Sequence, residues 1–420
     1  MVSEVVEPPQ VQRRATHTTT FTNNMALPVH RWFRYSAGFS AEWARDLIEG
    51  SGAQRVLDPF AGSATTVLAA ESAGAEGIGV DIHPFVSRVA RAKLGWRADD
   101  GVLIERAQAV LTAAREQVEV TPAGSPLVAK CFTVDSLGDL TRLRDAIGRL
   151  AQGDIYDELL WLALVSILRI CSPVGTAQWQ YVLPGKSKAK VAEPFSAFAE
   201  RVEIFADDMR WMNAQADAPQ GRFFEEDARH LASVPDGWAD LIVTSPPYAN
   251  NFDYADVARL EMSFLGEVNG WGDLKPLRDK LVKSCSQQMG RWDPSEALSS
   301  PLLEPIRDEL MKVYDELGAV RQTKGGNKAY HSMVLGYFHD SAQIWHALRR
   351  ASAPGVKVCY VVGDSAPYGV HVPVERWLGD LAVSAGFKDW TFEKVRDRNV
   401  KWKNRKHRVP LHEGRLWIEG

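Results

Sequence analysis

The spacing of apolar and polar positions divides the chain into short apolar runs and longer segments with helical periodicity. Short runs, several of which end at a carboxylate, lie at residues 56–58, 77–81, 223–227, 241–243, 358–365, 390–395 and 416–418. Runs of this length are typical of strands, whereas residues 41–49, 65–70 and 333–351 repeat apolar positions at helical spacing. The alternation of the two patterns predicts an α/β fold.

One interval breaks this alternation. Between Asp81 and Phe223 the chain is far longer than the loops of a compact α/β unit. Helical periodicity is present at residues 103–119, 137–150, 158–170 and 195–212. This periodicity predicts that the interval is a mostly helical insertion. Residues 1–24 are polar and rich in proline and threonine, so we expect a flexible arm there and order from about Pro28.

Composition narrows the class of protein. The 420 residues are 45% hydrophobic and 24% charged, which describes a soluble chain with room for a large core and insertions. A net charge of −4 requires that any nucleic-acid binding come from local basic patches. The four cysteines are widely spaced and form no metal-ligand pattern, so we expect no disulfide framework, no metal and a cytoplasmic location. The sequence contains no signal-peptide pattern and no run of about 18 apolar residues, so we expect no membrane role.

The first candidate site is the sequence Thr244-Ser245-Pro246-Pro247-Tyr248. Neither proline has an N–H to donate to a sheet, so the strand at residues 241–243 must end there. The prolines hold the preceding carbonyls in a stiff array at the carboxyl end of a strand, where open α/β sheets bind ligands. A tyrosine ring beside a hydroxyl and rigid acceptors suits a planar, amine-bearing group. An ordinary strand end with a Pro-Pro turn is the alternative interpretation.

The second candidate site is the sequence Asp58-Pro59-Phe60-Ala61-Gly62-Ser63, in which a strand ends in a carboxylate and a tight turn leads to a helix at Thr65. Small side chains here would let a ligand approach the backbone N–H groups, although the full dinucleotide fingerprint is missing. Asp81 ends the next strand 23 positions after Asp58, where such folds place a carboxylate for ribose hydroxyls. The pair predicts a nucleoside ligand.

Together the two motifs resemble those of the S-adenosylmethionine-dependent amino-methyltransferases, especially the DNA cytosine-N4 and adenine-N6 methyltransferases. The resemblance covers residues 20–95, 222–265 and 330–420, and implies a Rossmann-like sheet with helices on both faces and S-adenosyl-L-methionine as cofactor. It implies the catalytic residues Ser245, Pro246, Pro247 and Tyr248. It implies that the cofactor is bound by Phe33, Tyr35, Asp58, Pro59, Phe60, Ala61, Gly62, Ser63, Thr65, Asp81, Ile82, Asp227, Ala228 and Thr244.

The resemblance also suggests the reaction. Serine at the first catalytic position is similar to the cytosine-N4 group, whereas adenine-N6 enzymes more often carry aspartate or asparagine there. None of the four cysteines follows a proline, as the nucleophile of a cytosine-C5 enzyme typically does. We therefore expect methylation of cytosine N4 in a base flipped out of double-stranded DNA, with a cognate restriction endonuclease as a partner. The alternatives are an adenine-N6 enzyme, an RNA amino-methyltransferase and a non-catalytic nucleic-acid-binding protein, which adenosylmethionine binding would distinguish from an enzyme.

Resemblance and periodicity together suggest a division of the chain. A flexible arm at 1–24 precedes the methyltransferase core, which comprises a cofactor half at 25–96, a catalytic strand at 221–265 and a C-terminal part at 329–420. Two insertions interrupt the core. The first is the helical insertion at 97–220, a candidate for target recognition, and the second lies at 266–328. The cofactor loop precedes the catalytic motif, whereas the catalytic motif leads in most cytosine-N4 enzymes. Basic clusters supply the candidate nucleic-acid contacts Lys186, Lys188, Lys324, Lys401, Lys403, Arg405 and Lys406.

Overall fold

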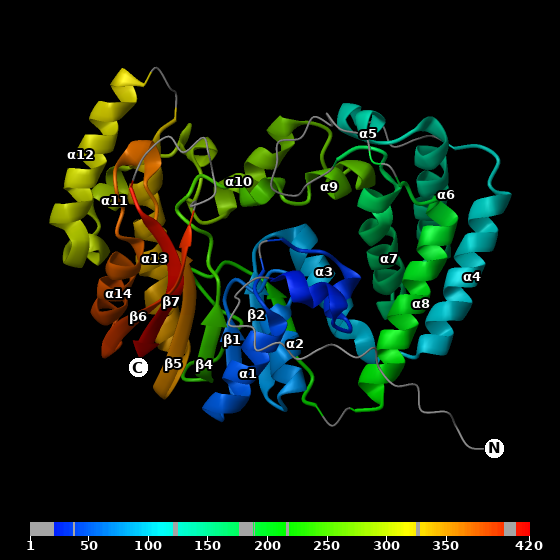
Figure 1. Ribbon diagram of the computed structural model, residues 1–420, viewed down its shortest axis with the longest axis horizontal. Helices are drawn as coiled ribbons and strands as arrows, with labels where there is room; N and C mark the ends of the chain where they lie inside the picture. The colour runs from blue at the N-terminus through cyan, green and yellow to red at the C-terminus, as the bar shows by residue number, and fades with distance from the viewer. Residues whose placement is uncertain are drawn as a thin grey trace.

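The computed structural model describes residues 21–36, 38–120, 125–175, 188, 190–215, 218–324, 328–398 and 409–420. Figure 1 shows a twisted sheet with helices on both of its faces and a separate group of helices, α4 to α8, on the right. Among the helices in the described ranges, none is long and apolar enough to cross a membrane. The mixed α/β class expected from the sequence is confirmed.

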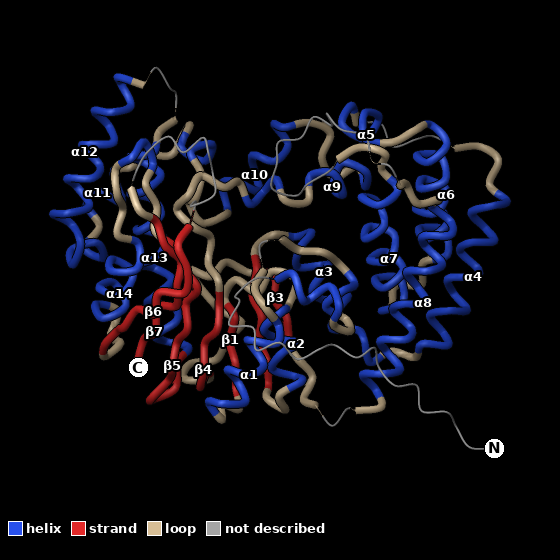
Figure 2. The backbone as a smooth tube through the Cα atoms, in the orientation of Figure 1, coloured by secondary structure: helices blue, strands red, loops and turns tan. Residues whose placement is uncertain are grey.

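The sheet has seven strands in the order β3-β2-β1-β4-β5-β7-β6, and they are drawn in red in Figure 2. Strands β1 to β5 are parallel to one another, while β7 runs antiparallel to both β5 and β6. Every predicted strand is present, and the strands are β1 Arg55–Asp58, β2 Glu76–Asp81, β3 Arg222–Glu225, β4 Ala239–Thr244, β5 Ser352–Gly363, β6 Asp389–Arg398 and β7 Leu411–Glu419.

Side chains alternate between the two faces of the central strands. Leu57 and Ile242 share a buried cluster with the apolar faces of α13 (Tyr330–Ala351) and α14 (Val374–Ser384). Their neighbours Val56 and Leu241 instead pack against α1 (Ala41–Ser51) and α2 (Thr65–Ser72). Because both faces are covered, the strands read as continuous apolar runs in the sequence.

The interval between β2 and β3 begins with α3 (Pro84–Leu94) and continues as α4 (Asp100–Glu116), α5 (Pro126–Cys131), α6 (Val134–Leu150), α7 (Ile155–Cys171) and α8 (Pro194–Asn213). Helices α4, α6, α7 and α8 pack on one another, and α7 also packs on α3. At that contact the rings of Phe85 and Trp161 lie 5.3 Å apart, and Arg88 pairs with Glu158 at 2.7 Å. The helical character predicted for this interval is confirmed.

After β4 the chain forms short helices above the sheet edge, namely η4 (Tyr254–Asp256), α9 (Arg259–Leu265), α10 (Lys275–Lys280), α11 (Ser295–Ser299) and α12 (Arg307–Thr323). Arg321 lies in the last turn of α12, because the helical pattern of that helix continues to Thr323.

Order also begins earlier than expected. Residues 21–26 form a 3-10 helix, and the Asn24 side chain is buried. Its amide donates to the Phe39 carbonyl at 2.8 Å and its oxygen accepts from the Ala41 N–H at 2.9 Å. Asn24 thus satisfies a backbone donor at the start of α1, which its position in a polar, threonine-rich stretch did not reveal.

Candidate active site

Parallel strands bring their carboxyl ends to one edge of the sheet, and β1 lies between β2 and β4 at the point where the strand order reverses. Ligands of open α/β sheets bind at such a point. A pocket with about 480 Å³ of empty space, counted with its opening to solvent, is found there. Its lining residues are Tyr35, Pro59, Phe60, Asp81, Ile82, His83, Glu226, Asp227, Ala228, Pro247, Tyr254, Lys280, Leu281 and Val282.

Asp58 ends β1 but does not line this pocket. Its carboxylate is buried and accepts from the Phe60 N–H at 3.0 Å and from the hydroxyls of Thr66 and Thr244 at 2.5 and 2.6 Å. Burial raises the pKa of Asp58 to about 6, and these three hydrogen bonds act in the opposite direction. Asp58 therefore joins the loop after β1, helix α2 and the end of β4 into one rigid unit.

The loop from Pro59 to Ala64 uses most of its own N–H groups. Besides the Phe60 N–H, the Ala61 N–H donates to Val80 O, the Gly62 N–H to Asp81 and the Ala64 N–H to Ala61 O. The expectation that a ligand approaches these N–H groups is therefore wrong for these four. Gly62 has φ +52°, and a Cβ there would lie 2.8 Å from the Tyr35 ring, so the glycine allows Tyr35 to close over the loop.

Asp81, at the end of β2, faces the pocket. One carboxylate oxygen accepts from the Gly62 N–H at 3.0 Å and the other from the His83 N–H at 2.9 Å. Burial raises the pKa of Asp81 to about 6, although these backbone donors favour the charged form. Each oxygen retains a second lone pair, so the carboxylate can still accept from a ligand.

Asp227, beyond the end of β3, also lines the pocket, but its charge is compensated. Arg229 binds it with both the Nε and the Nη2 groups, at 2.9 and 2.5 Å. The same guanidinium reaches Asp340 of α13 at 3.1 Å, and Asp340 also pairs with Lys283 at 3.2 Å. This chain of charges connects the β3 side of the pocket to the segment that supplies Lys280, Leu281 and Val282.

The catalytic motif predicted from the sequence follows β4 directly. Thr244 and Pro246 are buried, while Pro247 lines the pocket. The Tyr248 N–H donates to the Tyr254 hydroxyl at 3.2 Å. The Ser245 hydroxyl lies 3.4 Å from the Val361 carbonyl of β5, which is a long hydrogen bond. Burial, and then Glu413, raise the pKa of the Tyr248 hydroxyl, so this residue stays neutral.

Charged groups from the end of the chain surround Tyr248. The Arg398 guanidinium lies 5.3 Å from the Tyr248 ring centre, within the range of a cation–π contact. Its Nη1 donates to the Asp364 carbonyl at 2.9 Å, and Glu413 lies 4.0 Å from its Nε. Asp364 is the residue after β5, so the sheet fixes the position of this guanidinium.

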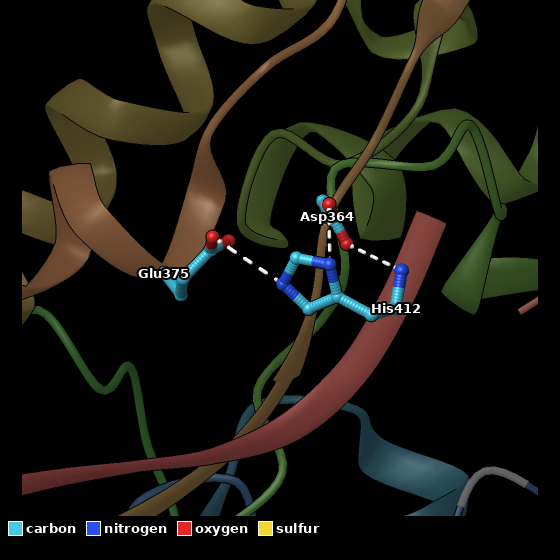
Figure 3. Close-up of side chains that lie close together, drawn as sticks. All are labelled: Asp364, Glu375 and His412. Carbon is cyan, nitrogen blue, oxygen red and sulfur yellow. Dashed lines mark hydrogen bonds and ion pairs between the residues drawn. The ribbon is translucent and has the colours of Figure 1, made fainter. Parts of the chain in front are cut away.

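Asp364 also belongs to the cluster in Figure 3. His412 Nδ1 lies 3.1 Å from Asp364, and its Nε2 lies 3.3 Å from Glu375. A second histidine, His371, pairs with Asp364 at 3.3 Å, and Asp364 raises the pKa of His371. Because the two nitrogens of His412 face different carboxylates, the ring itself bridges them and ties β5, β7 and α14 together.

The predicted cofactor set divides into two groups. The pocket brings together Tyr35, Pro59, Phe60, Asp81, Ile82, Asp227 and Ala228, whereas Phe33, Asp58, Ala61, Gly62, Ser63, Thr65 and Thr244 do not line it. Phe33 packs in the core, with its ring 5.8 Å from that of Phe85. Sequence reasoning missed His83, Glu226, Tyr254, Lys280, Leu281 and Val282 as lining residues. Only His83 and Glu226 had a signal, because Glu226 directly precedes Asp227 and His83 lies two positions after Asp81.

Known proteins match this chain along most of its length. A family model described as DNA methylase, of the N6/N4 type, matches residues 3–92. The Type II methyltransferase M.BsoBI of Geobacillus stearothermophilus is 25% identical, over 88% of this chain and 80% of its own length. The Type II methyltransferase M.AvaI of Nostoc sp. is 23% identical, over 88% of this chain and 81% of its own. These matches support an amino-methyltransferase of the N4/N6 family.

Most of the nucleic-acid contacts predicted for this chain lie outside the described residues, namely Lys186, Lys401, Lys403, Arg405 and Lys406. Lys324 is exposed after the last turn of α12. Lys188 is partly buried, and its ammonium group donates to the Arg169 carbonyl of α7. Of the two candidates that the structure describes, Lys188 is thus the one placed against the helical segment between β2 and β3.

Proposed function

We propose that this chain is a Type II DNA methyltransferase that transfers a methyl group from S-adenosyl-L-methionine to cytosine N4 in a flipped-out base. The observation that carries the proposal is the shared pocket at the sheet edge. Pro247 of the catalytic motif lines the same pocket as Asp81 and Phe60. Donor site and acceptor motif therefore adjoin each other. The two Type II methyltransferases found as relatives support DNA as the substrate.

The lining residues fit the cofactor chemically. Phe60, Ile82, Leu281 and Val282 provide apolar surface for a purine ring, and small-molecule sites are lined mainly by such side chains. Asp81 and Glu226 give the pocket two carboxylates against Lys280, while Arg229 compensates the charge of Asp227. That excess of negative charge suits a ligand with a sulfonium and an ammonium group. When bound, S-adenosylmethionine supplies an electrophilic methyl group.

Asp81 would accept hydrogen bonds from the ribose hydroxyls through its remaining lone pairs. Tyr35 would cover the loop, since its ring already contacts Gly62. Burial, and next the charge of Asp81, raise the pKa of Tyr35 well above its ordinary value, so its hydroxyl remains a donor. Asp58 would act indirectly, because it holds the loop after β1 in place.

The catalytic motif would prepare the amine. An exocyclic amine conjugated to a base ring is a poor nucleophile, so acceptors must bind its N–H groups and favour the geometry of attack. We assign this role to the Pro246 carbonyl and the Ser245 hydroxyl, with Tyr248 as the stacking surface for the base. The Ser245 hydroxyl has a long contact to Val361 and a side-chain hydrogen bond to Tyr248, and it would exchange one of these for the amine. The preference for cytosine rests on serine at this position.

Nucleoside analysis tests the proposal. Purified protein is incubated with isotopically labelled S-adenosylmethionine and duplex DNA, and the DNA is digested for mass spectrometry. Labelled N4-methylcytosine is the expected product. Labelled N6-methyladenine would correct the target base, and label transferred to RNA alone would refute DNA as the substrate. Ser245→Ala should lower kcat more than it raises KM, because the acceptor matters most as the amine becomes positively charged.

A cognate restriction endonuclease is the partner we propose for this enzyme. Type II methyltransferases are its relatives, and methylation would protect the sites that such an endonuclease cuts. Plasmid DNA from cells that express the chain should resist cleavage at the recognition sequence.

A further inference from the structure

A second pocket lies between the N-terminal segment and helices α7 and α8. It has about 980 Å³ of empty space, including its opening to solvent. Segment 31–36 separates it from the first pocket, because Tyr35 lines the first while Phe33, Arg34 and Ser36 line the second. The charged residues of its wall are five cations and one carboxylate, namely Arg31, Arg34, Arg169, Lys188, Arg201 and Glu261.

Two of the arginines are fixed by carboxylates. Arg31 donates from Nε and Nη2 to Asp208, at 3.0 and 2.6 Å, and Asp208 is itself buried beneath the pocket. Arg169 binds Glu261 of α9 in the same two-pronged way, at 2.6 and 2.8 Å. These pairs build a rigid wall, and their charges largely cancel.

Arg201 and Lys188 are not compensated in this way. Within the part of the chain that the structure describes, no carboxylate lies within ion-pair distance of either group. Arg201 donates to the Arg31 carbonyl at 3.4 Å, and Lys188 donates to the Arg169 carbonyl. Burial, and next the neighbouring charge of Arg31, lower the pKa of Arg201. Burial, and next Arg169, lower the pKa of Lys188.

We propose that this pocket binds a phosphate group of the DNA backbone, with Arg201 and Lys188 as its ligands. The inference rests on the proposed function, whose substrate carries that anion. Two partly buried, uncompensated cations gain more from a phosphodiester than exposed lysines do, because less water screens the contact. The pocket is reachable, since Met25 and Ile170 in its wall are 37% and 43% exposed. It lies on the far side of segment 31–36 from the cofactor pocket.

Salt titration of DNA binding tests this proposal. Affinity for a duplex is measured by fluorescence anisotropy at several salt concentrations, for the wild type, Arg201→Gln, Lys188→Gln and the double variant. Each lost phosphate contact should flatten the slope of log K against log salt by about 0.9. Because both side chains would bind one phosphate, the double variant should lose little more than either single one. S-adenosylmethionine affinity should be unchanged in all of them.

Two controls match the variants. Arg210→Gln removes an arginine from the same helix that pairs with Asp207 and Asp100 outside the pocket. Lys190→Gln removes an exposed lysine next to Lys188 in the chain. Both should keep the wild-type slope. Circular-dichroism melting verifies folding, and if Arg201→Gln fails to fold, the Lys188→Gln result decides.

A wild-type slope in folded Lys188→Gln protein that still methylates DNA would overturn the proposal. A pocket that binds only a free anion would also overturn the proposal. In that case inorganic phosphate would raise the melting temperature of the wild type but not that of Lys188→Gln, and the two proteins would show the same salt slope for DNA binding. A wild-type protein that binds no S-adenosylmethionine and transfers no methyl group would instead refute the proposed function.

Discussion

The two sides of the candidate active site obtain their partners from different distances along the chain. On the β1 and β2 side, Asp81 binds N–H groups at positions 62 and 83, and Asp58 binds groups at positions 60, 66 and 244. On the β4 side, Tyr248 is surrounded by Arg398 and Glu413, which follow it by about 150 residues. Apart from Thr244, the partners on the cofactor side are local, whereas the acceptor side depends on the completed sheet.

The largest effect is expected from Asp58→Ala. The change leaves two buried hydroxyls and the Phe60 N–H without their acceptor, so we expect a loss of about 4 kcal/mol in the free energy of unfolding. Chemical denaturation measures it, with Asp46→Ala as the control, since that carboxylate is 67% exposed on α1. A loss below about 1 kcal/mol would show that Asp58 does not hold the two motifs together.

Asp81→Ala addresses the pocket itself. We expect S-adenosylmethionine binding to weaken by about 3 kcal/mol in calorimetry, because charge-assisted hydrogen bonds to ribose hydroxyls are lost. Glu225→Ala is the matched control, as Glu225 ends the neighbouring strand, is exposed and does not line the pocket. Equal affinity in the two variants would remove Asp81 from the cofactor site.

Tyr248→Ala probes the acceptor side. If the ring holds an extruded base by its face, kcat/KM should fall by about 2 kcal/mol, whereas Tyr248→Phe should retain most activity. S-adenosylmethionine affinity should survive both changes, since only Pro247 of this motif lines the cofactor pocket. Full turnover by Tyr248→Ala would mean that the Pro-Pro-Tyr sequence only ends a strand.

The smallest effect is a pH dependence confined to the cofactor side. The pKa of Asp81 is raised to about 6, and only its ionised form accepts two hydrogen bonds from the ribose. Affinity for S-adenosylmethionine should therefore be full above about pH 7 and weaken about tenfold by pH 5. Asp81→Asn should abolish this dependence. A variant that keeps the wild-type profile would assign the titration to another group, of which Asp58 is the first to test because its pKa is similar.

The same contrast explains what could be predicted from the sequence. Strands β1, β2 and β4 and the acids that end two of them were visible because apolar runs and punctuating residues are local signals. Asp364 lies at the end of a predicted strand, but no local signal connects it or Arg398 with Tyr248, because their positions near Tyr248 depend on the pairing of β5, β6 and β7. Lys280 ends the short helix α10, and Leu281 and Val282 follow it in a loop whose path no periodicity describes. Asp58 was predicted from the sequence as a cofactor-binding residue. The sequence alone could not distinguish contact with a ligand from a buried carboxylate that is hydrogen-bonded to Thr66 and Thr244.

The helical segment between β2 and β3 has a consequence for how the protein folds. Ile78 to Asp81 pair directly with Arg222 to Glu225, so neighbouring strands are joined by a connection that holds five helices after α3. The entropy lost in closing a loop grows only slowly with the length of the loop. Strand pairing at such a large sequence separation is nevertheless slow, because this entropy is lost before the contacts between the strands stabilise the chain. Because α4, α6, α7 and α8 pack on one another, and α7 on α3, over shorter separations than β2 and β3 do, we expect these helices to assemble first. The arrival of β3 at the sheet edge should then be a late step, observable as late amide protection of residues 222–225 in pulsed hydrogen exchange.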